Sequence, residues 1–437
     1  MACELHVFQV SATNAPATYE QTITFNDGSF LPKACICLGA MQSSINTKER
    51  DAVWSRGFWA EGDQQHCFVG QKNDDDTGNG EAHRENESDR VHIKYNASGS
   101  SVKKEFQIKS IVAGTCTLQM EISNTSAGEY FLFFFIDAEE ACVGTALTKA
   151  SIGADTITHG NLDFTPNCIF FAGDSNASLD DHDADDTFGW FGFSDGSNDL
   201  AISWFGNDNA AGMSSQLNQS NALFMRDGAL AQGTRIAASL TSFGSSQFVV
   251  DYSTVPDTQK YFMFLALKIN NVYVGNNEAS STSTSVDQTI SGVGFQPQGV
   301  MFLSGNNTSF DADKESGSDD EIGITQGCAT DENDNAGFGI SGTEDDESVW
   351  RRTDNNDSFR TIAPNGDTAE NSGRVTDDSW GSDGFDIDWA TASAKKFGFI
   401  ALSNEAAAGA TAPVLGRARF QPALTRDVQR LRGFRNT

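Results

Sequence analysis

A five-residue segment of the sequence matches the nucleophile elbow of serine hydrolases. Gly192-Phe193-Ser194-Asp195-Gly196 fits the pattern G-x-S-x-G, in which a tight turn between a strand and a helix exposes a reactive serine. That chemistry needs an acid and then a histidine base later in the chain. All six histidines precede Ser194, so we predict a glycine-rich strand edge with no catalytic role.

Two acidic stretches, residues 180–186 and 331–335, have the carboxylate density of a calcium-binding loop. An EF-hand loop also needs Gly at its sixth position and Glu at its twelfth. Counting from Asp331 places Ala336 and Gly342 there. We therefore expect solvated surface loops and assign no metal ligand, although a cation site of another geometry stays open.

Carboxylates alone can hydrolyse glycosidic bonds, because a glycosidase needs only two of them at a suitable separation. With 60 acidic residues, the sequence does not single out such a pair. It contains no H-E-x-x-H motif, no phosphate-binding loop and no zinc-type cluster of Cys and His. We therefore predict a non-enzymatic protein without cofactor or metal, and a glycosidase-type depolymerase is the third functional hypothesis.

The last part of the chain, residues 409–437, differs from everything before it. Residues 416–437 carry six Arg against one Asp, and apolar residues recur there with the spacing of a short amphipathic helix. Apolar and Arg side chains on one arm suit an acidic partner, so we expect a basic docking tail. A solubilising tail is the open alternative. The candidate docking residues are Arg417, Arg419, Phe420, Leu424, Arg426, Val428, Arg430, Leu431, Arg432, Phe434 and Arg435.

The chain has a net charge of −31, and because residues 416–437 contribute +5, the remaining body carries −36. Such a body repels phosphate backbones and anionic bilayers, which argues against nucleic acid and membranes as partners.

The start of the chain does not have the regions of a signal peptide. Abundant Gly and 32 Phe against 8 Pro favour many short strands joined by turns. A β-protein of extracellular type without an export signal fits a phage particle, which is released by lysis.

An internal repeat sets the organisation of these strands. An F-x-P anchor begins at Phe30, Phe164 and Phe295, and each anchor follows a Thr-Ile pair and precedes a short apolar run. Two later landmarks keep the same phase. They are a glycine-containing strand, aligned at Gly57, Gly189 and Gly323, and an apolar closing strand, aligned at Phe131, Phe262 and Phe397.

The repeat predicts an all-β fold of three tandem, jelly-roll-like β-sandwich domains over residues 1–149, 150–279 and 280–408, followed by the tail at 409–437. The run Ser280–Ser285 is expected to be a flexible linker. The closing strands are continuously apolar, which predicts central strands that are covered on both faces.

Cys35 and Cys37 have the spacing of a metal or redox pair. At the same offsets from the anchor, the second copy has Ile and Phe and the third copy has Val and Phe. Residues two apart on a strand share a face, and a free cysteine behaves as a small hydrophobe. We therefore predict that both thiols are buried and are not bridged to each other.

At its F-x-P anchors the chain resembles structural proteins of phage virions, in which a Thr-Ile strand, a Gly-Phe-Gln-Pro turn and an apolar strand open a sandwich domain. The third copy carries most of this pattern, in the segment 288–297 (QTISGVGFQP). The resemblance implies a tail-associated or capsid-decorating protein and carries over no catalytic residue. We therefore expect a structural component of the virion, on the outer surface of capsid or tail, whose partners are other virion proteins and further copies of the chain.

The main alternative is a carbohydrate-binding adhesin or receptor-binding fibre protein. In that case loop aromatics and acidic loops would contact a host surface glycan. A glycan array on the purified protein separates the two hypotheses.

Overall fold

The computed structural model confirms the all-β fold: over the described residues its regular structure consists of strands β1 to β32, with no α-helix. The described part of the chain accordingly offers no helix with the length and apolarity for crossing a bilayer. The structure describes residues 2–10, 19–50, 52–62, 64–72, 82–95, 102–123, 128–183, 187–206, 213–226, 234–284, 287–305, 307–311, 321–331, 334–343, 349–362, 369–376 and 379–405.

The first sandwich pairs a seven-stranded sheet with a four-stranded sheet. The large sheet has the order β1 (Cys3–Val10), β11 (Glu129–Ile136), β3 (Ala34–Gln42), β5 (Ala52–Ala60), β6 (Gln64–Lys72), β7 (Ala82–Ser88) and β15 (Asp181–Asp183). The small sheet has the order β2 (Tyr19–Thr24), β10 (Thr115–Ser123), β9 (Val102–Val112) and β8 (His92–Tyr95). Buried apolar side chains from both sheets fill the space between them.

The second sandwich repeats this plan with a six-stranded large sheet. Its order is β12 (Glu140–Leu147), β22 (Tyr261–Lys268), β14 (Cys168–Gly173), β16 (Thr187–Ser194), β17 (Asp199–Gly206) and β18 (Met213–Asn218). The small sheet has the order β13 (Gly153–Thr158), β21 (Gln247–Thr254), β20 (Thr234–Gly244) and β19 (Leu223–Arg226).

The third sandwich again has a seven-stranded large sheet. Its order is β23 (Asn271–Ala279), β32 (Lys396–Ser403), β25 (Gly299–Ser304), β26 (Glu321–Thr330), β27 (Asn335–Thr343), β28 (Val349–Asp354) and β4 (Glu49–Arg50). The small sheet has the order β24 (Gln288–Ser291), β31 (Gly384–Thr391), β30 (Ala369–Val375) and β29 (Phe359–Ile362).

The closing strands lie inside the large sheets and are covered on both faces, as their apolar sequences predict. In β11, Phe131 and Phe133 pack between the two sheets of the first sandwich. Leu132 and Phe134 point the opposite way, into a core that the three large sheets share. Alternation along one strand therefore supplies two cores at once.

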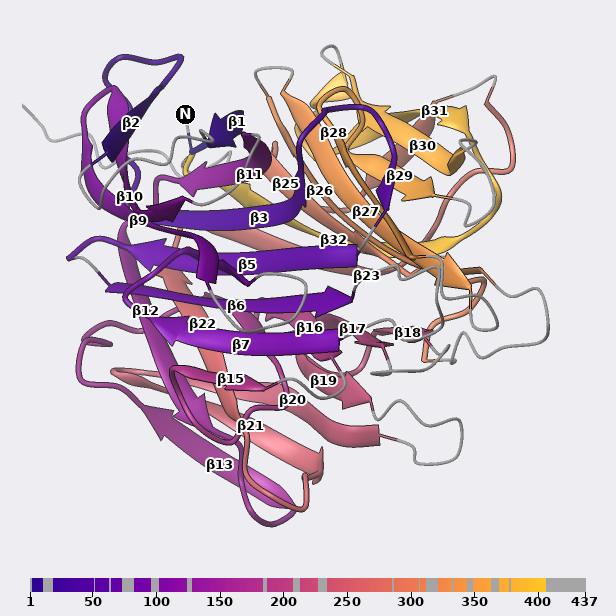
Figure 1. Ribbon diagram of the computed structural model, residues 1–437. Helices are drawn as coiled ribbons and strands as arrows, with labels where there is room; N and C mark the ends of the chain where they lie inside the picture. The colour runs from indigo at the N-terminus through magenta and orange to yellow at the C-terminus, as the bar shows by residue number, and fades with distance from the viewer. Residues whose placement is uncertain are drawn as a thin grey trace, which may run out of the picture.

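The three large sheets pack around this shared core in a pseudo-threefold arrangement. The three small sheets lie at separate outer corners, with β2, β9 and β10 at upper left, β13, β20 and β21 at the bottom, and β29 to β31 at upper right (Figure 1). The line on which the large sheets converge is called the central axis below. The chain therefore forms a ring of three sandwiches around one axial core.

Sheet pairing links neighbouring sandwiches along the ring. Strand β15 pairs with β7 of the first sandwich, and β4 pairs with β28 of the third. The predicted domain ranges leave β12 and β23 with the preceding copy, whereas these strands pair with β22 and β32 of the following one.

The predicted linker is anchored at its first residue. Ser280 is buried, its N–H donates to Lys395 O at 2.8 Å, and its Oγ accepts from Lys395 N at 2.9 Å. The expected flexibility at Ser280 is therefore wrong.

The predicted alignment of the glycine strands is also wrong in two copies. Strand pairing places Gly57 opposite Cys37, Gly192 opposite Phe171 and Gly327 opposite Phe302. A Cβ on any of these three glycines would lie within about 2 Å of a backbone carbonyl oxygen of the residue just before β8, β19 or β29, the edge strands of the small sheets. The equivalent glycines are therefore 57, 192 and 327, and each permits the close approach of the two sheets.

Candidate functional site

The polar residues at the joints between the sandwiches form the candidate functional site. At each joint, the segment after the third strand of one sandwich meets the edge strand of the neighbouring large sheet. At two joints this segment forms a short strand that pairs with the edge strand: β15 with β7, and β4 with β28. At the third joint, Asp311 N donates to Leu217 O of β18 at 3.0 Å. The three contacts close the ring in one direction: the second sandwich contacts the first, the third contacts the second, and the first contacts the third.

One residue with a positive φ lies at the same place in each joint, sixteen residues after the anchoring phenylalanine. These residues are Asn46 (φ 60°), Asp180 (φ 54°) and Asp311 (φ 56°). Each side chain accepts a hydrogen bond from a backbone N–H of the neighbouring edge strand or its end. The pairs are Asn355 N to Asn46 Oδ1 (3.0 Å), Ser88 N to Asp180 Oδ1 (2.7 Å) and Gln219 N to Asp311 Oδ1 (2.9 Å). Asn and Asp suit this role, because they tolerate left-handed backbone and carry a short acceptor.

A buried carboxamide lies four residues earlier in each joint, at Gln42, Asn176 and Asn307. Gln42 Oε1 accepts from Thr353 N, and Asn176 Oδ1 accepts from Arg84 Nε at 2.8 Å. Both amides therefore bond across a joint. Buried polar groups of this kind fix a unique docking geometry, since a shifted partner would leave them unsatisfied.

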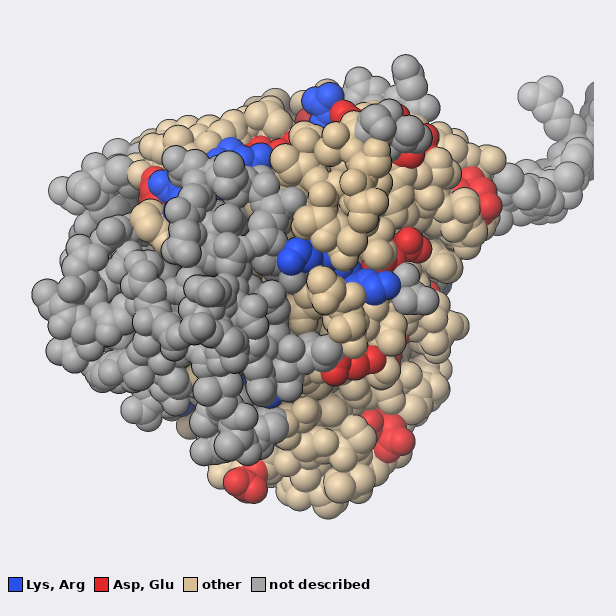
Figure 2. Space-filling view, turned by 90° about the vertical axis from the view of Figure 1, so that its right-hand side faces the viewer, with Lys and Arg blue, Asp and Glu red and all other residues tan. Residues whose placement is uncertain are grey.

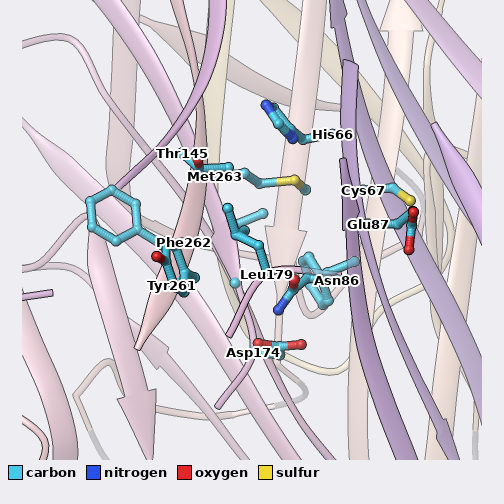
Figure 3. A pocket seen from close by; sticks show the side chains of 13 residues that line it. His66, Cys67, Asn86, Glu87, Thr145, Asp174, Leu179, Tyr261, Phe262 and Met263 are labelled. Carbon is cyan, nitrogen blue, oxygen red and sulfur yellow. The ribbon is translucent and has the colours of Figure 1, made fainter. Parts of the chain in front are cut away.

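The joint between the first and second sandwiches contains a pocket of about 20 Å³. Figure 3 shows His66 at one side, Asp174 at another, and Leu179 and Met263 between them. This volume is far below the roughly 300–1,000 Å³ of typical ligand sites and leaves room for about one water molecule. The pocket is therefore a small, mixed polar and apolar space between two sandwiches.

His66 departs from the pattern of the other two joints. By strand pairing its equivalents are Leu200, opposite Phe193, and Ala336, opposite Cys328. The second and third sandwiches therefore have aliphatic side chains at the position that His66 occupies in the first. Burial lowers the pKa of His66 to about 4, and its Nδ1 has no hydrogen-bond partner among the described residues. His66 is consequently neutral at physiological pH.

Two carboxyl groups line the pocket, and both have raised pKa values. Burial, with Asp180 and Glu105 nearby, raises the pKa of Glu87 to about 7. Burial raises that of Asp174 to about 6, against the opposing effect of its hydrogen bond from Asn176 N at 2.8 Å. Figure 3 shows Glu87 beside Cys67, on the far side of the strand from Asp174. The two carboxyls do not converge on one point, as the paired carboxylates of a glycosidase must.

A buried ionic cluster is a second local departure from the repeat. In the first sandwich Lys94 Nζ lies 2.6 Å from Glu129 Oε1, and Lys104 Nζ lies 3.0 Å from Glu129 Oε2. Strand pairing makes Met225 and Ile236 the equivalents of the two lysines in the second sandwich. Burial would raise the pKa of Glu129, but the two ammonium groups outweigh it and hold that pKa below its usual value.

His92 lies beside this cluster, and its Nδ1 is 2.7 Å from Ser55 Oγ. Burial, together with Lys104 and Lys94, holds the pKa of His92 well below its usual value. The first sandwich therefore carries charged groups in a core that the second sandwich fills with apolar ones.

Ser194 does not have the strand-turn-helix context of a nucleophile elbow. It ends β16, is fully buried, and its Oγ accepts from Gly196 N at 3.0 Å. The segment turns directly into β17, so no helix follows.

Cys35 and Cys37 are buried and free, as predicted from their repeat equivalents. Within the residues the structure describes, no group of three or more His, Cys, Asp or Glu side chains is arranged to hold a metal. The tail residues Arg417 to Arg435 lie outside the described residues, and so do residues 184–186 and 332–333 of the two acidic stretches.

Sequence reasoning missed the joint residues, although a signal for them is present. The twelfth residue after each anchor is Gln or Asn, and the sixteenth is Asn or Asp. Neither residue type indicates a joint by itself. Their constant distance from the F-x-P anchor shows that they belong to the repeat.

No protein-family model matches the sequence, and a search of curated proteins finds no match.

Proposed function

We propose that the protein is a non-enzymatic structural component of a phage virion, on the outer surface of the capsid or tail. The closed ring carries this proposal: three sandwiches of one chain share an axial core and cap one another's edge strands. Capping and pairing protect sheet edges that would otherwise join other chains. Such a body holds a fixed shape while exposed on a particle.

The described surface supports an outer, solvated position. On the face shown in Figure 2, described Lys and Arg side chains lie among Asp and Glu side chains and do not gather in one patch. The chain as a whole carries a net charge of −31. A body of this charge stays soluble and avoids nucleic acid.

The proposed partners are other virion proteins and further copies of the chain, bound through the sandwich domains and the basic tail. The tail supplies the opposite charge to the body, which would steer the two together. We expect a chain ending at residue 408 to keep its melting temperature and to lose incorporation into particles. Equal incorporation of the shortened and full-length chains would contradict docking through the tail.

Mass spectrometry of gradient-purified particles tests the proposal as a whole. Peptides of the chain should co-purify with the particles in a constant ratio to the major capsid protein. Recovery only from the soluble lysate fraction would contradict it.

A second candidate is the carbohydrate-binding adhesin, and one hollow favours it. An opening of about 380 Å³ on the second sandwich is lined by Thr234, Arg235, Asp257, Thr258 and Lys260. Hydroxyl and charged groups at this spacing can hydrogen-bond sugar hydroxyls. On a glycan array, specific binding that is lost in Asp257→Ala would favour this function over a purely structural one.

A further inference from the structure

Arg56 lies on the central axis, where the three large sheets meet. Arg56 of β5 is 1% exposed. Strand pairing places it opposite Leu38, and its equivalents are Phe191 opposite Ala172 and Gln326 opposite Leu303. The three sandwiches therefore bring Arg, Phe and Gln together at one level of the axis.

The guanidinium is surrounded by aromatic rings and one amide. Arg56 Nε donates to Gln326 Oε1 at 2.7 Å. Its Cζ lies 5.2 to 5.8 Å from four ring centroids, those of Trp54, Phe68, Phe191 and Phe338. Among the described residues no carboxylate forms an ion pair with Arg56. A buried cation is costly unless a counter-charge lies beside it.

Several buried donors at and near Arg56 have no acceptor among the described residues. Arg56 Nη1 and Gln326 Nε2 are buried without an acceptor among the described residues. The Gln326 amide is fixed in this orientation, because Arg56 Nε can only donate and so requires Oε1. Trp54 Nε1 and Trp204 Nε1 are likewise buried donors without acceptors, and their two rings lie 3.5 Å apart between centroids.

We propose that a small monovalent anion, of the chloride class, binds on the central axis against Arg56 Nη1 and Gln326 Nε2. An anion accepts from several donors and supplies the missing counter-charge, whereas a water molecule would add two donors of its own to a group of unpartnered donors. The first sandwich provides the arginine and the third provides the amide. The anion therefore bridges the ring at its centre.

The charge state of Arg56 is consistent with this site. Burial lowers the pKa of Arg56 to about 9, which still leaves the guanidinium protonated at neutral pH. A charged guanidinium at this buried position favours an anion beside it.

Bromide replaces chloride in such sites and gives an anomalous X-ray signal, so crystals of the full chain soaked in sodium bromide test the proposal directly. We expect an anomalous peak within hydrogen-bond distance of Arg56 Nη1 and Gln326 Nε2. Density for an ordered water at that place, or no peak there, would overturn the proposal.

Thermal unfolding in solution gives an independent measurement. At constant ionic strength, replacing gluconate by chloride should raise the melting temperature of the wild type steadily with chloride concentration. Arg56→Phe, which copies the residue of the second sandwich, should abolish this dependence. Arg374→Gln, which removes an exposed arginine paired with Asp388, should keep it. An equal chloride dependence in wild type and Arg56→Phe would contradict binding at the axis.

Discussion

Asp180 of the second sandwich caps Ser88 of the first, with Oδ1 2.7 Å from Ser88 N and Oδ2 3.0 Å from Ser88 Oγ. Its φ of 54° turns the chain so that β15 can follow along β7. Asp311 and Asn46 repeat the contact at the other joints. One side chain on one left-handed residue thus ties each pair of neighbouring sandwiches together.

Removing the Asp180 side chain should loosen this joint. Asp180→Gly keeps the left-handed backbone but deletes the acceptors, and we expect a loss of about 1–3 kcal/mol in the free energy of unfolding. Asp180→Asn keeps one acceptor and should stay close to the wild type. Hydrogen exchange of the β7 amides should accelerate in the glycine variant alone, and unchanged exchange there would show that the cap does not hold the joint.

His66 should make the protein less stable in mild acid. Its pKa of about 4 in the folded state lies below the 6.5 of an ordinary histidine, so the unfolded chain binds more protons between these values. Its contribution is complete above about pH 6.5 and is lost as the pH falls toward 4. His66→Leu, which copies Leu200, should gain about 1–3 kcal/mol over the wild type between pH 7.5 and pH 4.

Urea unfolding of both proteins at several pH values measures this gain. Glu87 and Asp174 are present in both proteins, so the difference between the curves isolates His66. Parallel pH profiles would mean that His66 is not held neutral by the joint.

The ionic cluster of the first sandwich should respond unequally to the loss of its members. Lys104→Ile copies Ile236 and leaves a balanced pair of Lys94 and Glu129, so stability should change by less than about 1.5 kcal/mol. Glu129→Gln leaves two buried ammonium groups without a counter-charge and should cost about 3–5 kcal/mol. Denaturant unfolding of the two variants checks the order, and equal losses would contradict the account of the cluster.

The eight cysteines should be unreactive in the native protein. All are free and buried, and burial raises the pKa of Cys35 and Cys37 well above the usual thiol value. A thiol reagent should label all eight cysteines in denaturant and essentially none in native buffer at pH 8. Rapid native labelling of Cys35 and Cys37 would show that the core of the first sandwich opens.

Local patterns in the sequence predicted the interior of each sandwich well. The Thr-Ile pairs place Ile23, Ile157 and Ile290 at buried positions of β2, β13 and β24, because alternation along a strand is a local property. The substitution of Cys35 and Cys37 by aliphatic and aromatic residues in the other copies predicted their burial for the same reason.

The ring and its axis depend on contacts that no local pattern encodes. Strand β4 pairs with β28 across some three hundred residues of chain. The position of Arg56 on the axis depended on the glycine alignment. That alignment failed because the equivalent glycine lies 27 residues after the anchor in the first copy, 28 in the second and 32 in the third. The joint amides at Gln42, Asn176 and Asn307 look like ordinary loop residues until the neighbouring sandwich is in place.

Single-particle cryo-electron microscopy of the virion tests the central claim most directly. The account predicts a three-lobed body on the outer surface of the capsid or tail, with one chain fitting all three lobes around a solid axial core. A complete particle reconstruction in which no outer density fits the chain would contradict it.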